Sequence, residues 1–197
     1  MSDSAAWDTR YAAMPGMFGE APNVFLLEQA HRLRPGMTAL SLGDGEGRNG
    51  EWLARQGLSV TVLDWSATGM ARAAARCPEL TCVIADATVW DWPAAAFDVV
   101  AWVFVHLPPE DRAAVAAGVA RALKPGGLLL LECFAPAQEG RRSGGPRDPA
   151  LLFTRAIVET AFAGYAVEAL LEGAVLLDEG PKHQGLAEVV RAVLRRK

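Results

Sequence analysis

The chain has 197 residues, of which 51% are hydrophobic, with a formal net charge of −4. This length and composition suit a globular domain with a full apolar core and are unlike those of a disordered chain. The acidic balance provides no basic surface and argues against nucleic acid as a partner. We therefore expect residues 1–197 to form a single domain that includes an N-terminal helical segment over 1–33.

The cysteines and the hydropathy indicate the compartment. Cys77, Cys82 and Cys133 have neither disulfide nor metal-ligand spacing, so the sequence predicts reduced thiols and no metal site. It contains no apolar run long enough to span a bilayer, and its beginning does not resemble a signal peptide. These features predict a cytoplasmic protein without a membrane partner, which we expect to be a monomer or a weak homodimer.

Helix signals recur along the chain. Trp7, Arg10 and Tyr11 lie at one-turn spacing and predict a short helix over 3–13. After a glycine-containing loop, Pro22 and Asn23 are residues typical of a helix start. Further helices are expected over 24–33, 48–56, 66–76, 110–123 and 149–162.

Apolar runs alternate with these helices. The run LSVTVL has no polar alternation, which is typical of a strand buried on both faces of a parallel sheet. Five such strands are expected, over 37–42, 58–63, 80–85, 97–105 and 128–134. Two more, over 165–177 and 186–194, leave no room for a helix between them and should pair antiparallel at the sheet edge. The alternation predicts an α/β fold, a doubly wound and mostly parallel sheet with helices on both faces.

Two connections stand out from the other loops. A tight turn is expected at 124–127, before the fifth strand. The polar segment 135–148 is long for a connection in a compact domain, and such loops are often lids, although plain disorder would also account for it.

The stretch TALSLGDGEGRNG, residues 38–50, joins the first of these strands to a helix. Gly43, Gly45 and Gly47 lack a Cβ, so the backbone there can turn sharply and approach a ligand closely. A strand, a glycine turn and a helix N-terminus together form a cradle for a nucleotide.

Two carboxylates follow the next two strands. Ligands of open α/β sheets bind beyond the carboxyl ends of the strands, where Asp64 and Asp86 are expected. Asp64 can accept hydrogen bonds from both hydroxyls of a ribose, and Asp86 can receive the amine of adenine. The loop spacing is Gly-x-Gly-x-Gly rather than the Gly-x-Gly-x-x-Gly of dinucleotide sites, and no Gly-Lys-Ser/Thr element for a triphosphate is present. S-adenosylmethionine fits this adenosine site better than a dinucleotide.

The chain resembles the class I S-adenosylmethionine-dependent methyltransferases over essentially its whole length, and most of all their tellurite-resistance-like and thiopurine-methyltransferase-like branch. The motifs that carry the likeness are Trp7-Asp8-Thr9-Arg10-Tyr11, Gly45-Glu46-Gly47-Arg48-Asn49, Asp64-Trp65-Ser66, Ala85-Asp86, His106-Leu107-Pro108-Pro109, Leu123-Lys124-Pro125-Gly126-Gly127, Gly144-Gly145-Pro146 and His183-x-Gly185. The resemblance implies a Rossmann-like seven-stranded sheet of order 3-2-1-4-5-7-6 with the last strand antiparallel.

The same resemblance implies the cofactor contacts. Gly43, Asp44 and Gly45 would line the methionine half, and Asp64 would hold the ribose. Trp65 and Ala87 would enclose the adenine, with Asp86 at its edge, since an indole face covers a purine well. The remaining residues expected to contact the cofactor are Trp7, Arg48 and Val103.

One position departs from the family pattern. Ser41 stands where an acid usually precedes the first glycine, so the methionine ammonium loses one expected partner. We expect Asp44 or Glu46 to supply the compensating negative charge.

For catalysis, the sequence predicts His106, Tyr11 and Arg10. A sulfonium donor is already activated, so holding the nucleophile near it carries most of the acceleration and a general base is optional. His106 is the best candidate base, but it would equally suit a helix cap or the core. Tyr11, Arg10, Arg142 and His183 are candidates for closing over the pocket.

The acceptor is expected to be a small-molecule nucleophile, with a soft chalcogen, a thiol or an oxyanion suggested by the resemblance. The arginines at 141, 142 and 147 suit an anionic acceptor, but solvated loop charges explain them as well. Two other functions stay open: a non-catalytic module that binds S-adenosylmethionine, and a reductase that binds a nicotinamide dinucleotide.

Overall fold

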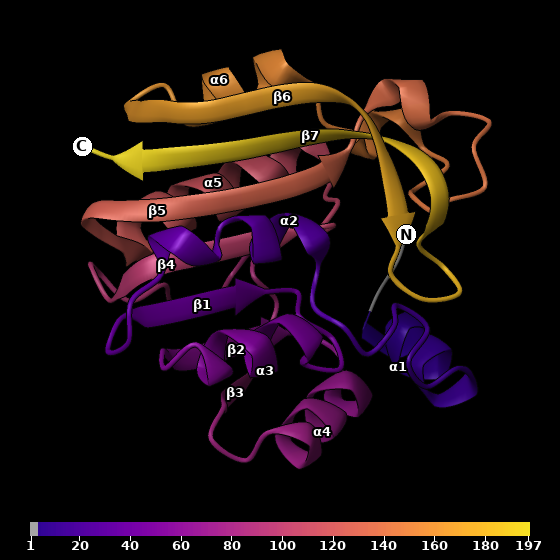
Figure 1. The fold of residues 1–197 in the computed structure, drawn as a ribbon, viewed down its shortest axis with the longest axis horizontal. Coiled ribbons are helices and arrows are strands. Elements are labelled where there is room, and N and C mark those ends of the chain that lie inside the picture. The colour runs from indigo at the N-terminus through magenta and orange to yellow at the C-terminus, as the bar shows by residue number, and fades with distance from the viewer. Residues whose placement is uncertain (1–3) are drawn as a thin grey trace.

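A computed structural model describes residues 4–197 and has at its centre a seven-stranded sheet of order β3-β2-β1-β4-β5-β7-β6 (Figure 1). The strands are β1 (Thr38–Leu42), β2 (Ser59–Asp64), β3 (Thr81–Ile84), β4 (Phe97–Val103), β5 (Leu123–Phe134), β6 (Tyr165–Asp178) and β7 (Gln184–Arg196). The first five strands are parallel, and β7 is antiparallel to both β5 and β6. The predicted strand order and the antiparallel last strand are confirmed.

Helices cover both faces of the sheet, as predicted for a doubly wound fold. They are α1 (Ser4–Ala13), α2 (Val24–Glu28), α3 (Arg48–Arg55), α4 (Ala67–Arg76), α5 (Pro109–Ala122) and α6 (Arg155–Ala161). In Figure 1, α2 and α3 lie in front of the sheet and α5 lies behind it. Short 3₁₀ turns occupy Ala30–Arg32, Pro136–Gln138 and Pro149–Leu151.

The sheet separates the core into two layers, and β4 contributes to both because successive side chains of a strand point to opposite faces. Val99 and Val103 pack with the buried residues of α2, α3 and α4. Val100 and Trp102 pack with those of α5 and α6. The apolar runs without polar alternation in the sequence are therefore strands buried on both faces.

The predicted helix over 149–162 is wrong in its first half. Pro149–Leu151 form a 3₁₀ turn, and the next residues are extended. The backbone N–H of Phe153 donates to the Phe134 carbonyl at 2.9 Å, which attaches this segment to the end of β5. The helix begins only after Thr154, whose side chain caps its N-terminus. Burial of the extended apolar segment overrides its helical periodicity.

Two other predicted elements also differ from those observed. The helix expected over 24–33 is α2 followed by a 3₁₀ turn, and the turn expected at 124–127 is part of β5. There Gly126 has φ +77° and the pairing with β4 shifts register. The polar segment 135–148 is ordered, because the Gln138 side chain donates to Ser143 at 2.9 Å and accepts from the Glu188 backbone at 2.8 Å.

The β6–β7 hairpin reaches past the sheet and bends towards α1 (Figure 1). The N-terminal segment, residues 14–23, meets the turn of this hairpin backbone to backbone. The Lys182 N–H donates to the Met17 carbonyl at 3.1 Å. A Cβ on Gly180 would lie 2.2 Å from the Gly19 nitrogen, so only glycine permits this approach.

Gly118 on α5 provides a test of core packing. An added Cβ there would lie 2.3 Å from ring atoms of Trp92. We expect Gly118→Ala to lower the free energy of unfolding by ~1–3 kcal/mol, because overpacking forces the ring or the helix to shift. Gly164→Ala is the matched control, because its Cβ would meet nothing within 4 Å. Urea denaturation of the two variants measures the difference, and equal stability would contradict the packing described here.

Candidate cofactor and acceptor site

The glycine loop follows β1 and has the backbone that the sequence predicts. Gly43 and Gly45 have φ of +59° and +57°, in the region that favours glycine. A Cβ on Gly43 would lie 2.3 Å from a Val105 methyl, and one on Gly45 would lie 2.1 Å from the Tyr11 hydroxyl. The loop therefore runs between the end of β4 and the N-terminal helix.

Asp64, at the end of β2, faces this loop. Its Oδ2 accepts from the Gly45 N–H at 3.0 Å and its Oδ1 accepts from the Ser66 N–H at 2.8 Å. Burial raises the pKa of this carboxyl, and the two N–H donors oppose that rise. Each carboxylate oxygen keeps a second lone pair, so Asp64 can still accept hydrogen bonds from a ligand.

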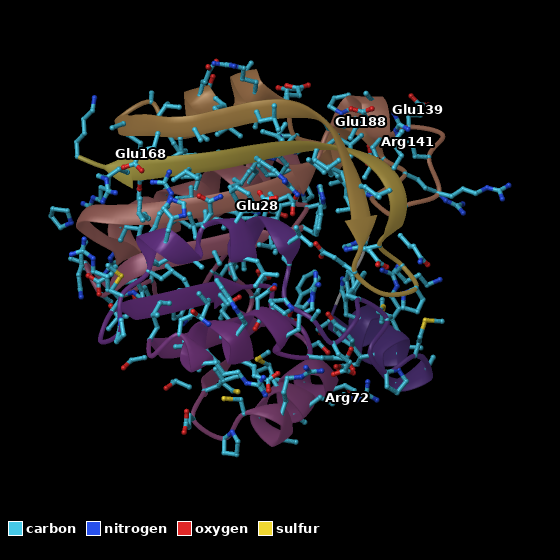
Figure 2. All side chains as sticks on the ribbon, viewed as in Figure 1. Glu28, Arg72, Glu139, Arg141, Glu168 and Glu188 are labelled. Atoms are coloured by element: carbon cyan, nitrogen blue, oxygen red, sulfur yellow. The ribbon has the colours of Figure 1, made fainter. Side chains whose placement is uncertain are left out.

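Helix α1 is attached to the N-terminus of α4. The Asp8 carboxylate accepts from the Ser66 hydroxyl at 2.6 Å and from the Thr68 N–H at 2.8 Å. On the same side, Arg72 donates to the Tyr11 carbonyl and to Glu46, both at 2.6 Å, and Figure 2 shows Arg72 beside α1 and α4. The helix predicted to close over the pocket thus covers the glycine loop.

Three predicted site residues lie on this helix. Tyr11 is only 4% exposed, and burial together with the negative charge of Asp64 raises the pKa of its hydroxyl. Trp7 lies 5.7 Å from the Tyr11 ring, and the exposed Arg10 guanidinium stacks 4.8 Å from the Trp7 ring. The structure places Tyr11 against the glycine loop, with Trp7 beside Tyr11 and Arg10 stacked on Trp7.

Of the two acids expected to compensate for Ser41, only Asp44 keeps an oxygen without a partner. Glu46 accepts from the Gly16 N–H and pairs with Arg72. Asp44 is 6% exposed, and its Oδ2 accepts from the Gly50 N–H at 2.8 Å. Its Oδ1 is buried and has no hydrogen-bond partner in the described part of the chain.

The buried Asp44 makes stability depend on pH. Burial raises its pKa to about 6, although the Gly50 N–H and the Ser41 hydroxyl oppose the rise. An unfolded Asp has a pKa near 3.9, so the folded protein binds this proton more tightly and loses stability as the pH rises through 6. When the pH is lowered from 7 to 5, the free energy of unfolding of the wild type, measured by urea denaturation, should rise by about 1.4 kcal/mol relative to that of Asp44→Asn. If the difference in unfolding free energy between the two proteins did not change with pH, a buried Asp44 with a raised pKa would be contradicted.

Arg48 has a buried acidic partner. Its guanidinium donates to Glu179 at 2.7 Å and to the Ala21 carbonyl at 3.0 Å, and its contact with a cofactor stays a prediction. Asn23 joins Glu179 to Glu132 through its side-chain amide, at 2.9 and 2.5 Å. This buried network connects the N-terminal segment, α3, β5 and the β6–β7 hairpin. Its acids were missed because no local motif marks them.

The other residues expected to contact the cofactor lie at or just after the ends of β2, β3 and β4. Trp65 is partly exposed, and Val103 is buried in the core. Asp86 is exposed and accepts from the Thr88 N–H at 2.9 Å, while the Ala87 carbonyl accepts from Trp92. Their contact with a cofactor stays a prediction.

His106 has the environment of a structural histidine. Its Nδ1 lies 3.0 Å from the Leu151 carbonyl, and its Nε2 lies 3.3 Å from the Phe134 N–H. A carbonyl only accepts and an N–H only donates, so Nδ1 carries the proton and the lone pair of Nε2 is occupied. Burial lowers the pKa of the ring to about 4. This geometry favours the structural alternative over the general base.

His183 has the opposite character, since its buried Nδ1 has no hydrogen-bond partner in the described residues. Its ring centroid lies 4.7 Å from Phe18, 4.5 Å from Phe104 and 5.4 Å from Phe134. We call these four residues the aromatic cluster. Phe104 follows β4 directly and has φ +53°, an uncommon conformation for a residue with a side chain and one often found at functional sites.

The arginines of the segment 135–148 differ in their surroundings. Arg141 pairs with Glu188 of β7, and Figure 2 shows the two side chains close together. Arg142 and Arg147 are exposed. Among residues 4–197, no three His, Cys, Asp or Glu side chains are grouped as metal ligands would be. None of the helices in that range combines the length and apolar character needed to cross a membrane.

The strand order, the glycine loop after β1 and the acid after β2 define the Rossmann-like fold of the class I S-adenosylmethionine-dependent methyltransferases. Residues 39–127 match the family model described as a methyltransferase domain. The cypemycin N-terminal methyltransferase of a Streptomyces species is 28% identical over 156 residues, which are 75% of this chain and 64% of that protein. The match therefore spans less than two thirds of that relative's length.

Solved structures share this fold. A structure described under the conversion of a disulfide bond into a thioacetal group during echinomycin biosynthesis has a TM-score of 0.77 at 20% identity, covering 98% of this chain and 91% of that chain. A TehB-like methyltransferase from Corynebacterium glutamicum has a TM-score of 0.66 at 23% identity, covering 98% of both chains. The described residues thus have the fold of these methyltransferase structures, and residues 39–127 are similar to a methyltransferase domain.

Proposed function

We propose that this chain transfers the methyl group of S-adenosylmethionine to a small-molecule nucleophile. The observation that carries the proposal is the juxtaposition of Asp64, the glycine loop and Tyr11. These groups come from β2, β1 and the N-terminal helix and meet at the carboxyl edge of the sheet, where ligands of open α/β sheets bind.

The residues present fit the cofactor. Asp64 would hold the ribose, and Trp65 and Ala87 would enclose the adenine, with Asp86 at its edge. The unpartnered Oδ1 of Asp44 is a buried acceptor that a methionine ammonium would satisfy, which supports the expected compensation for Ser41. When bound, S-adenosylmethionine supplies a methyl group on a positively charged sulfur. The lone pair of the nucleophile would form a bond to the methyl carbon, and the electron pair of the broken C–S bond would stay on sulfur.

The chain's own contribution is to position the reactants and exclude water. Tyr11 lies against the glycine loop with Trp7 beside it, and Asp8 and Arg72 hold their helix in place. Enclosure of this kind removes water from the reacting groups and fixes their orientation. No residue needs to act as a strong base, which agrees with the occupied ring nitrogens of His106.

We also propose the setting in which the chain acts. Residues 1–197 form one domain, as a monomer or a weak homodimer in the cytoplasm, without a nucleic acid or membrane partner. The balance of charge and the spacing of the cysteines support this part of the proposal.

Calorimetric titration with S-adenosylhomocysteine and with NADH tests the proposed function. We expect S-adenosylhomocysteine to bind and NADH not to bind. Tight NADH binding without a response to S-adenosylhomocysteine would favour a reductase and overturn the proposal. Binding of S-adenosylmethionine without product formation across an acceptor panel would instead favour a non-catalytic module.

A further inference from the structure

The aromatic cluster of Phe18, Phe104, Phe134 and His183 lies next to the glycine loop. Phe104 precedes Val105, and the Val105 side chain lies against Gly43. From the other side, Trp7 lies 6.1 Å from the Phe18 ring. Aromatic rings thus continue from Trp7, beside Tyr11, to the end of β4, where an acceptor would meet the methyl group.

The Nδ1 atom of His183 is buried without a hydrogen-bond partner among the described residues. The residue is 6% exposed. Leaving a buried polar group unpaired costs about 1–3 kcal/mol, so a partner that enters the cluster would recover that free energy. Burial and the nearby Arg48 lower the pKa of the ring to about 3, which keeps His183 neutral at neutral pH. Its Nδ1 can then accept from an N–H or O–H group, or donate in the other neutral tautomer.

The buried cation that acts on His183 already has a counter-ion, because Arg48 pairs with Glu179. Arg112 has no ion pair among the described residues, and its buried Nε lacks a hydrogen-bond partner there. Its contacts are with Phe153 and with the carbonyls of Ala150 and Leu107, outside the aromatic cluster. An anion beside His183 would lose its hydration while Arg48 stays neutralised by Glu179, which is unfavourable.

Phe18 indicates the shape that fits against His183. Its ring is half-buried and belongs to the N-terminal segment rather than to the sheet. It lies 4.7 Å from the His183 ring at an interplanar angle of 47°. A flat ring in this place contacts His183, which also contacts Phe104 and Phe134. The faces of aromatic rings attract a positive charge.

We infer that the acceptor is an uncharged aromatic amine or phenol that takes the place of the Phe18 ring and hydrogen-bonds His183 Nδ1. The inference rests on the proposed function. It restricts the acceptor to uncharged aromatic molecules and excludes oxyanions. Methylation of a neutral acceptor moves the positive charge onto its nitrogen or oxygen, beside the aromatic faces, and the surplus proton then passes to water. His183 orients the acceptor and does not need to remove the proton.

The test follows the His183 nitrogen directly. The full chain, labelled with ¹⁵N-histidine and saturated with S-adenosylhomocysteine, is titrated with 4-ethylaniline, 4-ethylphenol, 2-mercaptoethanol and tellurite. We expect the aromatic probes to shift the His183 Nδ1 signal, and tellurite and the thiol to leave it unchanged. A stronger response to tellurite or to the thiol, or no response to either aromatic probe, would overturn the inference.

The variant His183→Phe keeps a flat ring and removes the nitrogen. It should bind the aromatic probes about tenfold more weakly, the equivalent of one hydrogen bond of ~1.4 kcal/mol, with an unchanged affinity for S-adenosylhomocysteine. His31→Phe is the control, since His31 is exposed and lies on a 3₁₀ turn after α2. Failure of the wild type to bind S-adenosylhomocysteine would count against the proposed function. The wild-type titration does not depend on whether either variant folds.

Discussion

Asp64→Ala is expected to weaken S-adenosylhomocysteine binding by about 100-fold or more. The carboxylate would lose its hydrogen bonds to a ribose, and charge-assisted hydrogen bonds contribute roughly 1.5–3 kcal/mol each. The substitution would also leave the Gly45 and Ser66 N–H groups without their acceptor, which loosens the loop. Isothermal titration calorimetry measures the affinity, and full retention would show that the ribose binds elsewhere.

Asp98→Ala is the matched control for that experiment. Asp98 accepts from the Thr38 backbone and from Lys124, both at 2.8 Å, near the start of β1 and β4 and therefore at the opposite edge of the sheet. Its loss should lower the melting temperature without changing the affinity for S-adenosylhomocysteine. If the two variants lost affinity equally, the Asp64 result would reflect stability rather than binding.

Glu179→Ala is expected to lower the free energy of unfolding by ~3–5 kcal/mol. It would leave the Arg48 guanidinium, whose side chain is 8% exposed, without its counter-ion. The Asn23 amide and the Val24 N–H would also lose their acceptor. Removing one partner of a buried pair costs this much because the other charge stays desolvated. Urea denaturation measures the change, and Glu179→Gln should lose less because it retains the shape and one acceptor.

The control for Glu179 is an ion pair on the surface. Arg155 and Glu159 lie one turn apart on α6 at 3.0 Å, with both side chains about half exposed. Exposed pairs of this kind contribute roughly 0.3–0.5 kcal/mol. A loss for Glu179→Ala no larger than that for Glu159→Ala would contradict the buried network.

The sheet could be predicted because the sequence signals for its strands lie within short stretches of the chain. Apolar strand runs, the spacing of glycines and the missing crossover between β6 and β7 each occupy a short stretch of sequence. The close approach of Asp64 to Gly45 also follows, because the carboxyl ends of neighbouring parallel strands meet. The predicted helix over 149–162 failed where a long-range hydrogen bond from Phe153 to β5 competed with local periodicity.

The buried polar partners were not predictable in the same way. Asn23, Glu132 and Glu179 come from three distant parts of the chain, and nothing near each of them in sequence indicates that they meet. Arg48 lies in a motif associated with the cofactor, yet its partner Glu179 is 131 residues away. The different surroundings of His106 and His183 likewise depend on tertiary packing, because their contacts come from residues distant in sequence, such as Leu151 for His106 and Phe18 for His183.

The contact between Gly19 and Gly180 bears on the order in which the molecule is assembled. During synthesis the N-terminal segment leaves the ribosome first, but the hairpin turn that it docks against is made more than 150 residues later. Until then Phe18 has no His183 to lie on, and Arg48 has no counter-ion. Docking of residues 14–23 on the hairpin is therefore among the last steps of folding, whereas α1, which is held by Ser66, Thr68 and Arg72, can cover the glycine loop before β7 is made.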